Sequence, residues 1–167
     1  MENNYESIRY ILTRNSEYMD VRFYRESDFK SICNIEYKAF GDGAYSNYML
    51  KMMLKNTAGF TMVAEENSIL YGYATMNQMD STSVDLESIG VIPDHHRRGI
   101  GSMLLDSMEA EARKRGYKTI ILEVREKNTG AINFYRRHGY KASEFLSSYY
   151  SMSVNGSKNA YRMNKFI

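Results

Sequence analysis

Residues 83–102 read SVDLESIGVIPDHHRRGIGS, and this stretch decides the fold. Residues 83–91 predict a strand, which Pro93 ends. A short polar loop follows, and an amphipathic helix then runs to Arg115, where Gly116 provides a left-handed cap. The stretch therefore predicts a strand, loop and helix unit in a protein whose helices pack on a sheet.

The loop between this strand and this helix carries Gly99-Ile100-Gly101. The first turn of a helix has amide N–H groups without an intrahelical partner, and the helix dipole adds partial positive charge there. Two glycines let a bulky anion approach the backbone, and Arg97 and Arg98 add charged donors. The motif lacks the lysine of a P-loop, and Leu104 replaces the third glycine of a dinucleotide fingerprint. We therefore favour a pyrophosphate-binding turn over a solvated basic bend.

Hydrophobic periodicity predicts the other elements on both sides of this unit. Turns are expected at Asn67-Ser68 and Asn155-Gly156, which join neighbouring strands as hairpins. We expect one domain over 19–167, preceded by an N-terminal extension, residues 1–18, with a short helix at 5–17. The order of elements predicts an α/β fold of the α+β type, a mixed sheet with helices on its faces. The further strands are expected at 19–24, 60–65, 69–76, 119–124, 141–150 and 159–167, and the further helices at 28–40, 45–55 and 129–138.

The composition excludes several classes of protein. The 167 residues carry a net charge of +2, which argues against a nucleic-acid coat protein. Cys33 is the single cysteine, so an internal disulfide and a multi-cysteine metal site are excluded. No stretch approaches the roughly 20 apolar residues of a membrane span, and the polar N-terminus does not resemble a signal peptide. These features predict a cytoplasmic protein without a nucleic-acid or membrane partner.

Two polar side chains in apolar surroundings suggest chemistry. Glu123 lies within the apolar strand 119–124, where a carboxylate is costly to bury unless it is paired or has a task. It could be a general base of raised pKa, or a structural partner of Arg125 or a neighbouring lysine. Tyr135 could protonate a leaving group or be a core tyrosine, and Asn128 could cap its helix or donate to a ligand.

Taken together, these motifs resemble the GNAT superfamily of acetyl-CoA-dependent N-acetyltransferases. Within it, the chain is most similar to the protein N-terminal acetyltransferases of the RimI and Ard type, whose tail resembles Tyr149-Tyr150, Asn155-Gly156 and 160–163 here. The resemblance implies about seven strands, mostly antiparallel and splayed at the centre, with four main helices on both faces. The motifs that carry it are Ser88-Ile89-Gly90-Val91, His96-Arg97-Arg98-Gly99-Ile100-Gly101, Leu122-Glu123-Val124-Arg125, Asn128, Ala131-Ile132, Phe134-Tyr135 and Gly139-Tyr140.

The resemblance also implies roles for residues. Acetyl-CoA would be the cofactor, with Glu123 as general base and Tyr135 as general acid, and no metal is expected. Its pantetheine arm would lie between strands 83–91 and 119–124. The cofactor would contact Ile89, Gly90, Val91, His96, Arg97, Arg98, Gly99, Ile100, Gly101, Ser102, Asn128, Ala131, Phe134, Tyr135 and Arg137. The acceptor would contact Asp42, Tyr45, Asp85, Glu87, Tyr149 and Tyr150, and Asp85 or Glu87 could share the base role.

The acceptor implied by the resemblance is the N-terminus of a peptide or protein, bound by a monomer or homodimer. Two departures bear on it: His96 replaces the family's Gln or Arg, which predicts weaker or pH-sensitive cofactor binding, and Lys158-Asn159 replace an acidic pair, which leaves the peptide preference open. A small-molecule amine, such as a polyamine or an antibiotic, is an alternative acceptor if carboxylates form a deep pocket. A non-catalytic acyl-CoA sensor or scaffold is a third hypothesis. The deep pocket of the small-molecule alternative would be lined by the carboxylates of Asp42, Asp80, Asp85 and Glu87.

Overall fold

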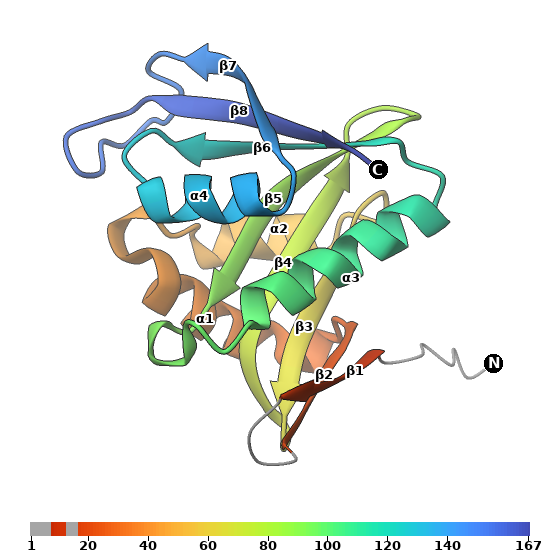
Figure 1. Cartoon of the computed structure of the whole chain (residues 1–167). Coiled ribbons are helices and arrows are strands. Elements are labelled where there is room, and N and C mark those ends of the chain that lie inside the picture. Colours follow the sequence, from red (N-terminus) through yellow and green to blue (C-terminus); the bar gives the residue numbers. More distant parts are fainter. Residues whose placement is uncertain (1–7, 13–16) are drawn as a thin grey trace.

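The computed structural model describes residues 8–12 and 17–167, and the described part folds around one eight-stranded sheet (Figure 1). Neighbouring strands are antiparallel except β5 and β6, which are parallel. The strands, in their order across the sheet, are β1 (Ile8–Leu12), β2 (Glu17–Phe23), β3 (Phe60–Glu66), β4 (Ile69–Gln78), β5 (Ser83–Val91), β6 (Thr119–Arg125), β8 (Ala160–Phe166) and β7 (Lys141–Leu146).

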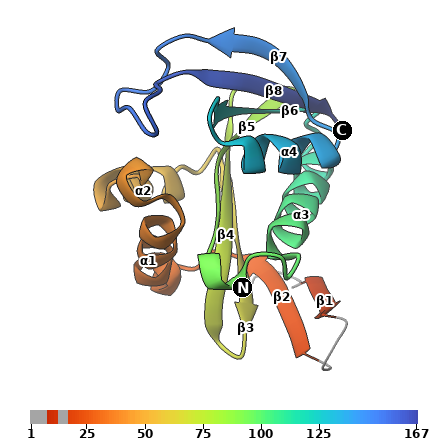
Figure 2. The ribbon, with the colours of Figure 1, turned by 60° about the vertical axis from the view of Figure 1, so that its left-hand side comes forward.

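Helices cover both faces of the sheet (Figure 2). One face carries α1 (Phe29–Phe40) and α2 (Asn47–Leu54), and the other carries α3 (Ile100–Lys114) and α4 (Thr129–Arg137). Each helix layer encloses its own apolar core, because residues along a strand alternate between the two faces. The larger core lies under α3 and α4, and the smaller one under α1 and α2. Single-turn 3₁₀ helices occur at Glu26–Asp28, Gly41–Gly43 and Pro93–His95.

The fold confirms the expected mixed sheet and the four helices, and it corrects the N-terminal extension. Residues 8–12 form β1, which pairs with β2, instead of a helix; the rest of the expected helix, 5–7 and 13–16, lies outside the described residues. The sequence IRYIL fits helical spacing, but it also suits a strand, and the free edge of β2 supplies backbone partners. The strand expected at 141–150 ends at Leu146.

Both predicted hairpin turns have left-handed backbone at their two central residues. Asn67 and Ser68 have φ of 51° and 64°, and Asn155 and Gly156 have φ of 51° and 77°. Positive φ at both positions matches the right-handed twist of the flanking strands. The first turn joins β3 to β4, and the second closes the connection between β7 and β8.

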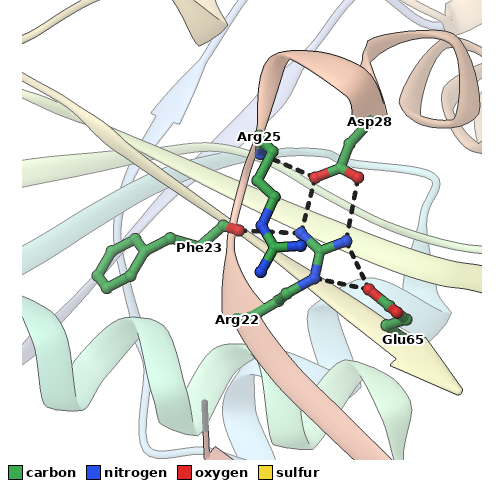
Figure 3. A network of polar contacts seen from close by, with 5 residues as sticks. All are labelled: Arg22, Phe23, Arg25, Asp28 and Glu65. Carbon is green, nitrogen blue, oxygen red and sulfur yellow. Dashed lines mark hydrogen bonds and ion pairs between the residues drawn. The ribbon is translucent and has the colours of Figure 1, made fainter. Parts of the chain in front are cut away.

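A buried ion network fixes the start of α1 (Figure 3). The guanidinium of Arg22 in β2 contacts Asp28 at 2.8 and 3.0 Å, and its Nε donates to Glu65 of β3 at 2.6 Å. Asp28 also accepts from the backbone N–H of Arg25 at 2.8 Å. Burial raises the pKa of Asp28, but the Arg22 and Arg25 hydrogen bonds lower it to below its usual value. Asp28 is the N-cap residue of α1, but its carboxylate makes no capping bond to that helix and ties the turn before α1 to the sheet.

Candidate active site

The two parallel strands at the centre of the sheet separate after a short pairing. β5 and β6 are paired only at Ser83, Val84 and Asp85, opposite 119–121. Both strands continue beyond this point, but they diverge, as Figure 1 shows. The backbone groups of β5 after Asp85 that face β6 therefore have no partner in that strand. This confirms the central splay.

A β-bulge lies where the strands diverge. Thr75 of β4 is opposite Ser88, and Met76 is opposite Leu86, so Glu87 of β5 is the extra residue. An extra residue bends a strand and shifts its alternation by one position. Asp85 before the bulge and Ser88 after it therefore both face α1 and α2, since Leu86 lies in the core on the opposite side.

The bulge also decides which backbone groups face the diverging side. Ile92 donates to Tyr71 of β4, and the antiparallel register places Val91 opposite Gly72. Hydrogen-bonded and non-hydrogen-bonded pairs alternate in such a ladder, so the amide groups of Ile89 and Val91 point away from β4, toward β6. These are the two residues that the resemblance assigned to the pantetheine arm.

The N-terminus of α3 lies at the far end of the diverging strands. Gly99 is its N-cap residue with φ of 81°, a conformation that glycine adopts without steric cost. A Cβ atom added to Gly101 would lie 3.5 Å from the ring of Phe134 in α4 and 4.0 Å from Val91. The first amides of α3 thus open onto a narrow space between the end of β5 and α4, in which a side chain at 101 would compete with a ligand.

Two side chains of the preceding loop are occupied by the protein itself. The guanidinium of Arg98 contacts Glu66 at 3.0 Å and His95 Nδ1 at 2.9 Å, and its role toward an anion stays a prediction. His96 Nε2 is 3.0 Å from the carbonyl oxygen of Val91, which places its ring against the end of β5. Arg97 is exposed and has φ of 67°. The backbone amides at the start of α3 belong to the same predicted anion site.

Asp85 is the most unusual titratable group on the α1 side of the sheet. It is the last residue of β5 that pairs with β6, and its Oδ1 atom is buried without a hydrogen-bond partner among the described residues. Burial raises the pKa of Asp85 to about 7, and the charges of Glu87 and Glu123 add to the rise against the effect of Arg162. A carboxyl group that changes protonation near neutrality suits proton transfer.

Glu123 faces the same side but is held by several donors. Its Oε1 accepts from Arg162 Nε in β8 at 2.7 Å, and its Oε2 accepts from the Tyr149 hydroxyl at 3.2 Å. The side chain of Glu123 is only 10% exposed. Of the two hypotheses for this residue, an ion pair is present, and its partner is Arg162, not Arg125 or a lysine. These contacts hold the Glu123 carboxylate in place near Asp85.

Three tyrosines enclose this pair of carboxylates. Tyr149 and Tyr150 follow β7, their rings 5.0 Å apart at a right angle, and the Arg125 guanidinium lies 3.8 Å from the centre of the Tyr150 ring. Burial and the charge of Arg125 act in opposite directions on Tyr150, and its pKa is raised to about 12. Tyr45 comes from the α1–α2 connection, and burial and Glu87 raise its pKa as well. All three stay protonated at neutral pH.

Two predicted site residues belong to α4: Asn128 caps the helix, and Tyr135 lies in the core beneath it. Asn128 is the N-cap: its Oδ1 accepts from the backbone N–H of Ala131 at 3.1 Å, so only its amide nitrogen remains for a ligand. Tyr135 is buried in the core under α3 and α4, with Phe134 and Tyr140 against its ring. Burial raises the pKa of Tyr135, which keeps its hydroxyl a proton donor at neutral pH.

Other predicted site residues do not join the carboxylate pair. Asp80 accepts from the backbone N–H groups of Thr82 and Ser83 in the β4–β5 turn, and Asp42 is exposed in the 3₁₀ turn after α1. Glu87 is half-buried and accepts from Asn77 at 3.3 Å. Of the four carboxylates that a deep acidic pocket would need, Asp85 alone belongs to the carboxylate pair, and Glu87 is near enough for its charge to raise the pKa of Asp85. Ile100, Ser102, Ala131 and Arg137 lie on α3 and α4, at the helix starts and at the last residue of α4.

Sequence analysis missed Arg162. It lies in the sequence 160–163, which the resemblance covered, but its register opposite Glu123 depends on which strand pairs with β6. A basic residue in a strand near the sheet edge usually faces solvent, so no local pattern marks Arg162 as a site residue. Only the position of β8 between β6 and β7 reveals that it neutralises Glu123.

Fold and site together define a class: a mixed sheet that splays beside a helix N-terminus, with carboxylates and tyrosines at the point of separation. The sequence matches the acetyltransferase (GNAT) family over residues 7–140. The chain therefore belongs to the GNAT family, which confirms the expected class, an N-acetyltransferase.

Named relatives agree with this class. The [ribosomal protein bS18]-alanine N-acetyltransferase of Escherichia coli is 37% identical over 78 residues, 47% of this chain and 52% of that one, so the aligned segment spans about half of this relative. An N-alpha-acetyltransferase of Sulfurisphaera tokodaii is 29% identical over 143 residues, 78% of this chain and 85% of that one. The crystal structure of the E. coli ribosomal-protein-S18-alanine N-acetyltransferase superposes with a TM-score of 0.82 and 25% identity, covering 89% of this chain and 94% of that one.

Two features are absent from the described residues. None of the helices there has the length and apolar character needed to cross a bilayer. No group of three or more metal-ligating side chains is found in the same residues. The three histidines, for example, contact separate partners: His95 meets Arg98, His96 meets the Val91 carbonyl, and His138 Nδ1 lies 2.9 Å from the Phe134 carbonyl oxygen.

Proposed function

We propose that this protein transfers the acetyl group of acetyl-CoA to the α-amino group at the N-terminus of a protein. One observation carries the proposal: a helix N-terminus and a pair of carboxylates lie at opposite ends of the diverging part of β5. A long anionic carrier can bind at the first feature and present its far end at the second. The names of the relatives support a protein N-terminus as the acceptor.

Acetyl-CoA fits the residues that this arrangement exposes. The amides at the start of α3 would hold its pyrophosphate. Because Gly101 has no Cβ atom, the space beside these amides stays open to the phosphate groups. The backbone groups of Ile89 and Val91, which point toward β6, would bond the amides of the pantetheine arm. When bound, the cofactor supplies an activated acetyl thioester. His96 would have to share the Val91 carbonyl or move from it.

The carboxylates would receive the proton that the amine must lose. An α-amino group has a pKa of about 7.7–8.0 and a lysine about 10.4, so an N-terminal amine needs far less help. Asp85, with a pKa of about 7 and a buried oxygen without a partner, is matched to this task. The resemblance gives the base role to Glu123, but Glu123 is paired with Arg162, and we place it as a carboxylate that holds the amine beside Asp85.

Tyr135 is our assignment for the proton donor. Its helix, α4, lies on the face opposite the acceptor carboxylates, and its raised pKa keeps Oη protonated at neutral pH. The hydroxyl would hold a proton for the sulfur that leaves, and Asn128 at the start of the same helix would offer its amide nitrogen to the cofactor. Donor and base therefore act from opposite faces of the sheet.

The acceptor class is tested with a panel of substrates. Peptides with different first residues, the same peptides with blocked N-termini, spermidine and free lysine are assayed for thiol release from acetyl-CoA. We expect release with free N-termini and none with blocked ones. Faster release with spermidine would assign a small-molecule amine, and calorimetric binding of acetyl-CoA without any release would assign a non-catalytic sensor; either result overturns the proposal.

A further inference from the structure

Besides Asp85 and Glu123, another buried carboxylate, that of Glu36, lies on the acceptor side of the sheet, and the proposed chemistry does not use it. Glu36 of α1 is 1% exposed, on the helix face that also carries Ile32 and Ile35. Its Oε2 accepts from the Tyr73 hydroxyl at 2.5 Å, and its Oε1 accepts from the backbone N–H of Tyr45 at 2.8 Å. A buried carboxylate needs such donors, because it has lost its hydration.

The hydrogen bonds form a chain with a defined direction. The Tyr73 hydroxyl lies between Glu36 and the Ser88 hydroxyl, which is 2.9 Å away. A phenol has one proton, and the carboxylate is the stronger acceptor, so Tyr73 donates to Glu36 and Ser88 donates to Tyr73. The chain then ends at the Tyr45 amide. Glu36 thus accepts at both oxygens, and burial raises its pKa although these bonds oppose the rise.

This chain connects the two strands and loops that bound the proposed acceptor site. Ser88 follows the bulge residue Glu87 in β5, and Tyr73 is a fully buried residue of the neighbouring strand β4. Tyr45 begins the segment that leads into α2, whose N-cap is Ser46. The Tyr45 side chain lies close enough to Glu87 and Tyr150 for their charges to affect its pKa.

The packing around the chain gives α1 little freedom. A Cβ atom added to Gly90 would lie 3.2 Å from the Phe40 ring and 3.1 Å from the Tyr73 ring, so the last turn of α1 rests directly on β5. The connection after α1 turns through Gly41–Gly43, where Gly41 has φ of 53°. Beyond this turn, the hydrogen bond from the Tyr45 amide to Glu36 anchors the connection to the rest of the fold.

We propose that Glu36 is a positioning residue for the acceptor: through the Tyr45 amide it fixes the segment 41–46, and so the Tyr45 ring, against the carboxylate pair. The inference rests on the proposed function, since it assigns Tyr45 to the wall of the same site. Glu36 does not contact the reacting atoms. Its loss therefore affects acceptor binding and leaves cofactor binding intact.

The test compares three variants. Glu36→Leu keeps the volume but leaves the Tyr45 N–H without an acceptor, whereas in Glu36→Gln the amide oxygen can face Tyr45 and the amide nitrogen can donate to Tyr73. Tyr73→Phe removes the other donor and keeps the Tyr45 bond. We expect the peptide KM to rise at least about tenfold in Glu36→Leu, with the acetyl-CoA KM within about twofold, since a charge-assisted hydrogen bond is lost on the acceptor side only. Glu36→Gln and Tyr73→Phe should stay near wild type.

Amide hydrogen exchange gives a readout that does not depend on the acceptor. Protection of the Tyr45 amide should fall in Glu36→Leu and be restored in Glu36→Gln, while amides in the middle of α3 serve as an internal reference. If Glu36→Leu is unfolded, the double variant with Tyr73→Phe, which removes the buried phenol hydroxyl beside the leucine and keeps that of Ser88, takes its place. Glu26→Gln, the same chemical change at an exposed position, is the matched control.

The outcomes separate this inference from the proposed function. If wild-type protein acetylates no peptide, the proposed function fails, and the KM comparison is made with whichever amine is acetylated. Equal rises in both KM values, or an unchanged acceptor KM despite lost protection at Tyr45, would overturn the positioning role. Unchanged protection at Tyr45 in Glu36→Leu would overturn it as well. A selective rise in the acceptor KM with lost protection supports it.

Discussion

Asp85→Asn should make the protein both more stable and less active above neutral pH. The substitution keeps the shape of the side chain and removes a charge from a site where one oxygen is buried without a partner. Folding raises the pKa of Asp85 from 3.8 to about 7, chiefly through burial and then through Glu87 and Glu123. The folded protein therefore disfavours the ionised form that the proposed reaction requires.

The size of the effect follows from this shift. A rise from 3.8 to about 7 is about three units, which at 1.36 kcal/mol per unit is about 4 kcal/mol. The folded state binds this proton more tightly than the unfolded chain, so wild-type stability falls as the pH rises from about 4 to about 7. At pH 8 the Asn variant should be more stable by up to about 4 kcal/mol, a rise in Tm of roughly 8–16 °C. Below pH 4 the two proteins should be equally stable.

Activity is measured as kcat/KM against pH with a free N-terminal peptide. In wild type the rate should rise with the ionisation of Asp85 near pH 7 and of the amine near pH 8. The low-pH side of the profile should therefore be steeper than the ionisation of a single group would give. Asp85→Asn should lower kcat/KM at pH 7 by about 10²–10⁴-fold and leave only the amine's limb. Glu123→Gln, the matched variant, should also lower the rate but keep the Asp85 limb, since Glu123 is held by Arg162.

Two results would refute this reasoning. If Asp85→Asn is no more stable than wild type at pH 8, the buried charge does not carry the cost that its position implies. If its kcat/KM and pH profile match those of wild type while Glu123→Gln removes a limb, the proton goes to Glu123, and Asp85 is only a neighbour of the site.

Three further predictions test other parts of the site and fold. Gly101→Ala should fold normally, since its Cβ makes ordinary contact with Phe134, but should raise the acetyl-CoA Kd about tenfold by calorimetry. Tyr135→Phe should lower kcat by about 10²-fold with an unchanged acetyl-CoA KM, and an unchanged kcat would leave it a packing residue. Asp28→Asn should cost about 2–4 kcal/mol in urea unfolding at pH 7, a difference that shrinks as the pH falls below 3.8 because the folded pKa of Asp28 is lowered.

Local sequence signals predicted the parts of the fold that short-range physics determines. The helix after Gly99 and the hairpin turns at Asn67 and Asn155 depend on glycines, caps and positive φ within a few residues. The Asn128 cap was predicted for the same reason, because its partner amide is only three residues away. The separation of β5 and β6 came from the family resemblance, and no local pattern contained it.

The parts that sequence could not supply depend on strand order and on long-range pairing. Arg162 reaches Glu123 only because β8 lies beside β6, and Tyr73 reaches Glu36 across 37 positions of sequence. The segment 8–12 has both helical spacing and strand propensity, and the free edge of β2 decides between them. Arg98 contacts Glu66 because the β3–β4 hairpin brings that carboxylate to it, a long-range contact that no local pattern contains.

The bulge at Glu87 explains why one strand can serve both halves of the reaction. Without the extra residue, Ser88 would face the same side as Leu86, into the core under α3, and its bond to Tyr73 could not form. With it, Asp85 and Ser88 both face the acceptor side, while the amide groups of Ile89 and Val91 turn toward the diverging strand β6. In the proposed reaction, proton transfer, loop positioning and cofactor binding would thus fall to Asp85, to Ser88, and to Ile89 and Val91 along β5. Shifting any of them by one position would move its function to the wrong face of the sheet.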